Sequence, residues 1–391
     1  MAYLDHAATT ALRPEARDAW LAAHEVVGNA ASIHGAGRAA RRILAESREQ
    51  IAADLAVAPS SVVFTSGGTE ADNLAVSGGF AARHGDDPQR RVIVLSRIEH
   101  KAVSEPATVL QESDAELEWL DVDSTGSVDP DQVRSILRHR GDQVALVALM
   151  WANNEVGAVQ SVAEIGRLCR EAGVQLHSDA VQAIGNVAVQ ADAVGTLALS
   201  AHKVGGPKGI GVLVVDPTAS VDPLLRGGGQ ESGLRAGTVD VPGAAAAAAA
   251  IHEAVLHQPG HAARVRTLRD QLLQGLREMP EQSGEPGVVV NSTEAGLPGL
   301  VSVSFPGCDA DALMMLLDSA GIAVSTGSAC SVGIPKPSYV LAAMGSEYPG
   351  STLRFSLGWN STADDVRAAL AALPEAVERT RRATALSGSR S

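Results

Sequence analysis

The chain has 391 residues, of which 45% are hydrophobic and 19% charged, a composition typical of a globular protein and not of a disordered or fibrous one. With 31 basic and 45 acidic residues the formal net charge is −14, which argues against a general nucleic-acid-coating protein. The alanine run at 244–250 is too short to cross a bilayer, and the N-terminus lacks a signal-peptide profile. Three cysteines do not suggest a disulfide framework. We predict a cytoplasmic enzyme with no membrane partner and no direct nucleic-acid partner.

Short apolar segments alternate with helical patterns through the first two thirds of the chain. Helices are expected near residues 38–57 and 162–172, where apolar residues recur at helical spacing. Several of the apolar segments are rich in valine and leucine without polar alternation, as strands buried on both faces are. Strand–helix alternation of this kind predicts crossover units, a largely parallel sheet and an α/β fold. Strands are expected at residues 62–65, 91–96, 144–150, 175–178, 196–200 and 211–215.

A second set of elements follows a long charged helical pattern at residues 255–280. Strands are expected there at 288–291, 301–305 and 353–357, and helices at 310–320 and 363–380. We predict a large domain of residues 15–256 and a smaller C-terminal domain of residues 257–391, which residues 1–14 join.

The sequence TSGGTE at residues 65–70 follows the first apolar strand and opens a helical pattern. A glycine pair lets the backbone approach a ligand closely, and a helix start offers unpaired N–H groups. Gly68 and Thr69 therefore indicate a phosphate cup, with an ordinary strand–helix turn as the alternative.

Polar side chains follow the next strands in chain order. His100 could stack on a planar ring or shuttle protons, and Asn154, in WANNEVG, lies where ligands of parallel sheets gather. Asp179, with Gln182 three residues later, could pair with a protonated pyridine nitrogen. Lys203 could form an imine with an aldehyde cofactor. Each position alone has an ordinary structural alternative, but the set in this order matches what pyridoxal phosphate needs.

Cys330 lies among glycines and serines in STGSACSVGIPKPSY, a composition that suits a mobile loop with a reactive thiol. Cys169 lies on an apolar helical stripe and is expected to pack inside, and Cys308 is assigned no role. Arg354 is a strand arginine amid apolar neighbours. It could hold a substrate carboxylate with two hydrogen bonds, or it could form a structural ion pair.

Over nearly its whole length the sequence resembles the cysteine desulfurases, in the class V aminotransferase family of fold-type I pyridoxal-phosphate enzymes. The likeness rests on the segments YLDHAATT, SIH at 32–34, TSGGTE, EHKAV, NNEVG, SDAVQ, SAHK, GGGQE, RAGT, GSACS, PSYVL and RFSLG. It implies a large domain with a mainly parallel seven-stranded sheet and a smaller C-terminal α+β domain. The distance from Cys330 to PSYVL resembles the long-loop group, which serves iron–sulfur cluster assembly and tRNA thiolation.

The resemblance also implies a role for each matching residue, with no metal site. It implies that Lys203, His100 and Cys330 are catalytic: Lys203 as the imine-forming lysine, His100 also stacking on the ring, and Cys330 carrying the persulfide. The other implied contacts are Asp179 with the ring nitrogen, Asn154 and Gln182 with the phenolic-oxygen side, Gly68, Thr69, Ser200 and His202 with the phosphate, Thr238 with the phosphate of the other subunit of a homodimer, and Arg354 with Asn154 at the substrate.

The implied reaction converts L-cysteine to L-alanine and leaves the sulfur on Cys330, from which a sulfur-acceptor protein takes it for iron–sulfur cluster assembly or for thio-modification of tRNA or DNA. Three positions depart from the family pattern without removing a catalytic group: Ala30, Ala201 and Trp359. A selenocysteine lyase or an aminotransferase would share the cofactor residues, and a sulfur-carrier scaffold would not need Lys203.

Overall fold

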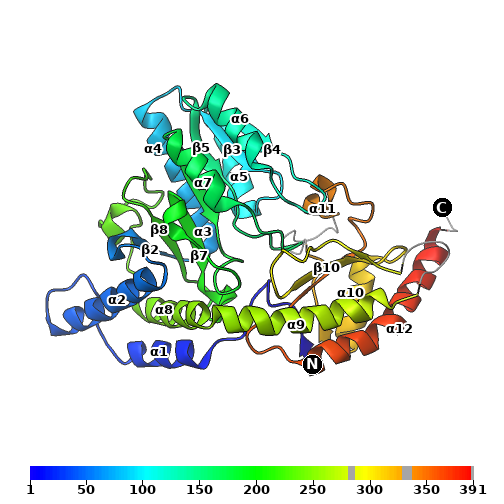
Figure 1. The fold of residues 1–391 in the computed structure, drawn as a ribbon. Coiled ribbons are helices and arrows are strands. Elements are labelled where there is room, and N and C mark those ends of the chain that lie inside the picture. Colours follow the sequence, from blue (N-terminus) through cyan, green and yellow to red (C-terminus); the bar gives the residue numbers. More distant parts are fainter. Residues whose placement is uncertain (281–286, 328–336, 389–391) are drawn as a thin grey trace.

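The computed structural model describes residues 1–280, 287–327 and 337–388. Its main feature is a seven-stranded sheet in the order β2-β8-β7-β6-β5-β3-β4 (Figure 1). Neighbouring strands are parallel from β7 to β4, whereas β8 is antiparallel to both β2 and β7. This arrangement confirms the α/β prediction and the mainly parallel sheet. The strands are β2 (Val62–Thr65), β3 (Val92–Ser96), β4 (Glu116–Leu120), β5 (Val144–Ala148), β6 (Gln175–Asp179), β7 (Thr196–Ser200) and β8 (Gly211–Val215).

The residue pattern predicted six of these seven strands and missed β4. That strand reads ELEWL, and four of its five side chains are only half-buried because it forms the edge of the sheet. The other six strands are almost wholly buried, which is why their apolar segments were recognisable.

Helices cover both faces of this sheet (Figure 1). On one side α1 and α2 pack on the alanine-rich α8, whose small side chains allow close approach. A π-helical turn at Leu74–Gly78 joins α3 to α4, so that residues 68–86 form one continuous helical segment. The helices of this part are α1 (Pro14–His24), α2 (Gly35–Asp54), α3 (Gly68–Asn73), α4 (Gly79–Asp86), α5 (Lys101–Leu110), α6 (Pro130–Arg140), α7 (Val162–Glu171) and α8 (Val241–Leu256).

The helix expected over residues 255–280 is divided differently. Helix α8 ends at Leu256 and α9 (Gln258–Arg277) begins after His257, with Pro259 in its first turn. Proline is well tolerated at a helix start and poorly in its interior, so it marks a new helix. Helix α9 then runs from the seven-stranded sheet toward β10 and α12 (Figure 1).

The C-terminal region has its own small sheets and its own hydrophobic cluster. A three-stranded antiparallel sheet has the order β12-β10-β9, and β1 pairs in parallel with β11. The N-terminus therefore packs with this region, and the proposed boundaries at 14 and 256 stay a prediction. The elements are β1 (Ala2–Tyr3), β9 (Val289–Val290), β10 (Leu300–Ser304), β11 (Ile322–Ala323), β12 (Thr352–Ser356), α10 (Ala310–Ser319), α11 (Tyr339–Ala343) and α12 (Ala363–Gly388). Within the described residues no helix is long and apolar enough to span a bilayer.

Candidate active site

A cavity of about 510 Å³ lies at the carboxyl edge of the seven-stranded sheet. Strands β3, β5, β6 and β7 are parallel, so the residues that follow them meet at this edge. Strand β2 points the same way, because β8 runs opposite to both β2 and β7. Nearly all the sequence-predicted cofactor residues line the cavity: Gly68, Thr69, His100, Asn154, Asp179, Gln182, Ser200, His202 and Lys203.

The segment from Ser66 to Glu70 forms one wall of the cavity at the start of α3. A Cβ at Gly68 would lie 2.9 Å from Val181 Cγ2 and 3.3 Å from Ser200 Cβ, so only glycine fits there without displacement. Glu70 receives hydrogen bonds from Arg235 at 2.8 Å and from Ser66 N at 2.7 Å. Burial alone would raise the pKa of Glu70, but these hydrogen bonds lower it below its ordinary value. The wall is thus held open and rigid, as an anion-binding turn requires.

His202 lies at the opposite side of this wall, after β7. Its Nδ1 is 3.2 Å from Thr9 Oγ1. Burial, reinforced by the neighbouring Lys203 and Lys208, lowers the pKa of His202 to about 4. The ring is therefore neutral at pH 7, and one of its nitrogens can donate a hydrogen bond to an anion.

Asp179 is the last residue of β6 and is 7% exposed. One carboxylate oxygen accepts a hydrogen bond from Val181 N at 2.8 Å. Burial raises the pKa of Asp179, while the charges of His100 and Lys203 oppose that shift. A buried carboxylate facing a cavity is stabilised by a cationic partner that enters the cavity.

Lys203 follows β7 and reaches the same cavity. Its Nζ donates hydrogen bonds to Ala7 O at 2.6 Å and to Ala8 O at 2.8 Å. Gln182 Nε2 also donates to Ala7 O, at 2.8 Å. The N-terminal segment, 196 residues away from Lys203 along the chain, therefore positions the lysine.

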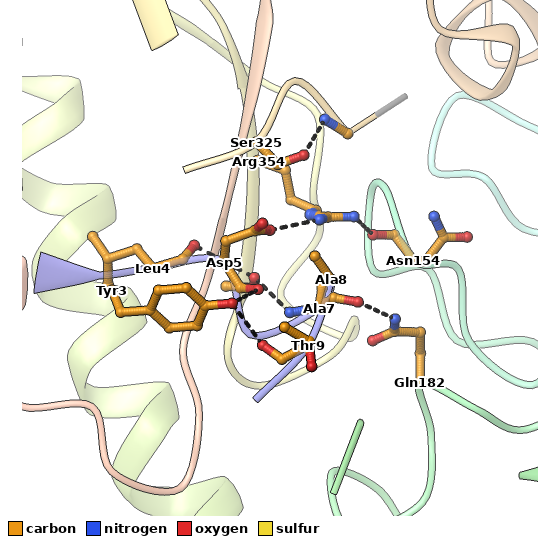
Figure 2. Close-up of polar contacts among 12 residues, drawn as sticks. Tyr3, Leu4, Asp5, Ala7, Ala8, Thr9, Asn154, Gln182, Ser325 and Arg354 are labelled. Atoms are coloured by element: carbon orange, nitrogen blue, oxygen red, sulfur yellow. Dashed lines mark hydrogen bonds and ion pairs between the residues drawn. The ribbon is translucent and has the colours of Figure 1, made fainter. Parts of the chain in front are cut away.

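Arg354, Asn154 and Asp5 form a connected group at the rim of the cavity (Figure 2). Arg354 Nη1 donates to Asn154 O at 2.9 Å and Nη2 donates to Asp5 Oδ1 at 2.8 Å. The ion pair with Asp5 is the structural alternative considered for this arginine, and the guanidinium also lines the cavity. Two polar atoms of the group, Arg354 Nε and Asn154 Oδ1, are buried without a hydrogen-bond partner. Buried polar groups without partners indicate a place for a ligand.

Two buried residues at the cavity, Asp72 in its lining and His177 next to Asp72, were not recognised in the sequence. Asp72, on α3, is 3.2 Å from His177 Nε2, and His177 Nδ1 is 3.0 Å from Thr196 Oγ1. Burial, together with the charges of Asp179 and Glu99, raises the pKa of Asp72 well above its usual range. Asp72 lies on the apolar side of its helix, which is the signal that could have identified it.

Ligand atoms of Asp72, His100 and Asp179 all lie within 4.8 Å of one another. Among the described residues this is the group with a spacing that could hold a metal ion. All three residues line the cavity, and Asp72 is already hydrogen-bonded to His177. We therefore interpret the cluster as one wall of an organic cofactor site.

Two of the predicted site residues, Cys330 and Thr238, are not among the described residues that line the cavity. Cys330 lies outside the described residues. Thr238 is exposed and does not line the cavity of its own chain, so its contact with a second subunit stays a prediction. Cys169 and Cys308 are buried, as predicted for Cys169. Burial raises the pKa of Cys169 to about 12 and also raises that of Cys308.

Comparison with known proteins agrees with this geometry. The family model "Aminotransferase class-V" matches residues 2–369. The chain belongs to the class-V aminotransferase family. It is 46% identical to the "IscS-like cysteine desulfurase" of Mycobacterium tuberculosis over 98% of both chains. These findings confirm the resemblance to the cysteine desulfurases.

Solved structures give the same result for the fold. A structure described as "NIFS-LIKE PROTEIN" superimposes with a TM-score of 0.88 at 32% identity, over 97% of this chain and 99% of that one. A second, "SspA in complex with cysteine", has a TM-score of 0.78 at 29% identity, over 91% and 99% of the two chains. The predicted fold-type I architecture of this family is therefore confirmed.

Proposed function

We propose that the cavity at the sheet edge is the active site of a pyridoxal-phosphate-dependent cysteine desulfurase that converts L-cysteine to L-alanine and transfers the sulfur to Cys330. The observation that carries the proposal is the meeting of Lys203 and Asp179 in one cavity of a chain that is 46% identical to a cysteine desulfurase over 98% of its length. Lys203 and Asp179 are the amine and the carboxylate that this cofactor uses.

The residues present fit pyridoxal phosphate. The cavity volume of about 510 Å³ suits a ligand of that size. Its wall at Gly68 has no space for a Cβ, and the buried Asn154 Oδ1 lacks a partner. The anion wall and Asp179 lie in the same cavity, as the phosphate and the ring nitrogen of one molecule require.

We assign the residues that would hold the cofactor accordingly. Asp179 would accept a hydrogen bond from the ring nitrogen, and His100 would lie against the ring. Asn154 and Gln182 would contact the phenolic-oxygen side. The phosphate would be bound by Gly68, Thr69, Ser200 and His202, and by Thr238 of a second copy of the chain. Pyridoxal phosphate, when bound, supplies an electron sink that stabilises negative charge on the amino-acid substrate.

Lys203 and His100 are the proton-carrying groups of the proposal. The Lys203 amine would hold the cofactor in the resting enzyme and move the proton of the substrate α-carbon. His100 lines the same cavity and would take the proton from a thiol, because the thiolate is the nucleophilic form of cysteine.

Substrate recognition would depend on Arg354 and Asn154. Arg354 keeps a buried Nε donor without a partner at the cavity rim, so it can bind a carboxylate in addition to Asp5. The solved relative in complex with cysteine supports L-cysteine as the substrate.

Cys330 would accept the sulfur as a persulfide. The two described cysteines support this assignment by exclusion, because both are buried, have raised pKa values and do not line the cavity. Thiol exchange would then pass the sulfur to an acceptor protein, for iron–sulfur cluster assembly or for thio-modification of tRNA or DNA.

A homodimer and a cytoplasmic location complete the proposal. The exposed position of Thr238 leaves it available to a second copy, and a reducing compartment suits a reactive thiol. The net charge of −14 supports protein acceptors over direct nucleic-acid contact.

The variant Cys330→Ser tests this function. We expect it to keep the cofactor absorption band and to form alanine from cysteine only at the background rate, because the sulfur has no acceptor. Cys308→Ser is the matched control and should behave as the wild type, since Cys308 is buried away from the cavity.

The measurements are alanine release, sulfide release and the mass of the protein after one turnover. Full alanine formation by Cys330→Ser would contradict the proposal. Such a result together with keto-acid exchange would indicate an aminotransferase, and a preference for selenocysteine would indicate a selenocysteine lyase.

A further inference from the structure

Glu155 follows the candidate substrate-binding residue Asn154 in the chain, but its side chain contacts the C-terminal region. Its side chain is buried, with 4% of the residue exposed. Glu155 Oε2 accepts a short hydrogen bond from Ser338 Oγ, at 2.5 Å. The two residues are 183 positions apart. Ser338 stands directly before α11, two residues after the last residue of 328–336, the part of the chain that includes Cys330 and that the structure does not describe.

The hydroxyl of Ser338 takes part in two hydrogen bonds. Its oxygen accepts a hydrogen bond from Leu341 N at 3.1 Å and so caps the N-terminus of α11. A serine hydroxyl can donate one hydrogen bond, and Ser338 donates it to Glu155. The carboxylate therefore fixes both the orientation of the hydroxyl and the start of α11.

The chain on the other side of residues 328–336 approaches the same carboxylate. Gly327 has a positive φ of +79°, and a Cβ there would lie 3.6 Å from Glu155 Oε2. Ser325 is tied to Arg354 by two backbone hydrogen bonds, from Ser325 N at 3.2 Å and from Arg354 N at 2.6 Å. The described chain on both sides of residues 328–336 thus lies close to Glu155, which is next to the cavity-lining Asn154 in the chain.

The charges around Glu155 favour this arrangement. Burial raises the pKa of Glu155, whereas the hydrogen bond from Ser338 and the charges of Arg354, His100 and Lys101 oppose the shift. Tyr339, next to Ser338, donates a hydrogen bond to Glu99 O at 2.7 Å, beside His100. Ser338 and Tyr339 are therefore hydrogen-bonded to Glu155 and Glu99, the chain neighbours of the cavity-lining Asn154 and His100.

We propose that Glu155 is a positioning residue for sulfur transfer: through Ser338 it holds the C-terminal end of the Cys330 segment in place beside Asn154 and Arg354. The inference rests on the proposed function of Cys330. Glu155 itself touches neither cofactor nor substrate, because it does not line the cavity. Its effect should therefore appear in sulfur transfer and not in substrate binding.

The test separates these two steps in the holoenzyme. Cysteine binding is followed by the change in cofactor absorbance, and persulfide formation on Cys330 by mass spectrometry in a single turnover. We expect Glu155→Ala and Ser338→Ala each to slow persulfide formation about 10- to 100-fold, the effect of losing one charge-assisted hydrogen bond. Cysteine affinity and cofactor content should stay within about 2-fold of the wild type.

Conservative variants and a double mutant identify the contact. Glu155→Gln and Ser338→Thr keep an acceptor and a hydroxyl, and we expect each to retain persulfide formation within about 3-fold. The double variant Glu155→Ala/Ser338→Ala should be no slower than either single variant, because both remove one interaction. Ser319→Ala, an exposed serine on α10, is the matched control.

Three results would overturn the inference: unchanged persulfide formation in both alanine variants, a parallel loss of cysteine binding, or additive effects in the double variant. If Glu155→Ala does not fold, Ser338→Ala and Glu155→Gln still test the hydrogen bond between Ser338 and Glu155. A wild-type protein that forms alanine without a persulfide on Cys330 would instead contradict the proposed function.

Discussion

Three acidic side chains are buried at the candidate cofactor site: Asp72 and Asp179, which line the cavity, and Glu99. Burial raises the pKa of all three; the charges of Asp179 and Glu99 also raise the pKa of Asp72, and the charge of Asp179 also raises that of Glu99. Burial lowers the pKa of His177 to about 4, which favours the neutral imidazole, and its Nε2 can then accept a hydrogen bond from the Asp72 carboxyl group, whose pKa is raised. The charges of His100 and Lys203 oppose the upward shift at Asp179, the carboxylate that a cationic ring nitrogen would need.

Glu99 provides a test at the residue scale. Its Oε1 accepts hydrogen bonds from Ser96 Oγ at 2.6 Å and from Met150 N at 2.9 Å, while Oε2 is buried without a hydrogen-bond partner. Burial, aided by the charge of Asp179, raises the pKa of Glu99 from 4.5 to about 8 against those hydrogen bonds. The folded protein therefore keeps a proton that the unfolded chain loses. The free energy of unfolding should fall as pH rises from about 4.5 to about 8 and should level off above that.

We expect Glu99→Gln to remove this part of the pH dependence, because glutamine keeps the shape but does not titrate. The measurement is the denaturation midpoint of both holoenzymes in matched buffers at about pH 5, 6.5 and 8, which span the interval between the ordinary and the raised pKa of Glu99. An equal loss of stability with rising pH in wild type and variant would show that Glu99 does not carry the effect.

At the scale of elements, the active site depends on how strand ends and helix starts meet. Gly68 begins α3 shortly after β2, and its missing Cβ leaves room for Val181 and for Ser200 at the end of β7. Val181 is a short branched side chain and cannot move far. The glycine therefore sets the distance between the anion wall and the rest of the cavity.

We predict that Gly68→Ala weakens cofactor binding by about 10-fold or more, an effect in the range of overpacking, with a smaller effect on the folded apoprotein. Titration of the apoprotein with pyridoxal phosphate, followed by absorbance, measures it. Gly85→Ala, on α4 with open space around it, is the control and should bind as the wild type does while gaining helix stability. Equal binding by the Gly68 variant would show that the wall tolerates a methyl group.

At the scale of the whole molecule, the N-terminal segment connects the hydrophobic cluster of the main sheet with that of the C-terminal region. Leu4 is fully buried in the C-terminal cluster, and its carbonyl accepts a hydrogen bond from Ser356 N at 2.7 Å. The next residues place Asp5 against Arg354 (Figure 2). The carbonyls of Ala7 and Ala8 accept hydrogen bonds from Lys203 Nζ. The site is therefore completed by chain that precedes the first strand of the main sheet.

We expect Leu4→Ala to lower the free energy of unfolding by about 2–5 kcal/mol, the range for a fully buried leucine, and also to weaken cysteine binding because Asp5 and Arg354 lose their support. Denaturant unfolding and cysteine titration of the holoenzyme measure the two effects. Leu12→Ala, at a leucine that is 39% exposed, should change stability by no more than about 0.5 kcal/mol. If both variants bind cysteine equally well, the N-terminal segment does not support the substrate site.

The sequence by itself determined the α/β alternation and the residues that follow each strand. Both are local: buried strands such as β5 and β7 read as apolar runs, and parallel strands bring the residues after them to one edge. His100, Asn154, Asp179 and Lys203 could therefore be predicted to meet. The glycines and serines around Cys330 indicated a reactive thiol in a loop, and the family resemblance added its role as the sulfur carrier.

Only the tertiary structure decided which distant residues support that site. Arg354 meets Asp5 across 349 positions, Ser338 meets Glu155 across 183, and His177 meets Asp72 across 105. No periodicity in the chain indicates such pairs: the first two form where the N-terminal segment and the C-terminal region fold back onto the main sheet, and the third forms where α3 packs on β6. Strand β4 also needed the tertiary structure, because its half-polar sequence fits a strand only at the edge of a sheet, and the sequence does not show which strand forms that edge.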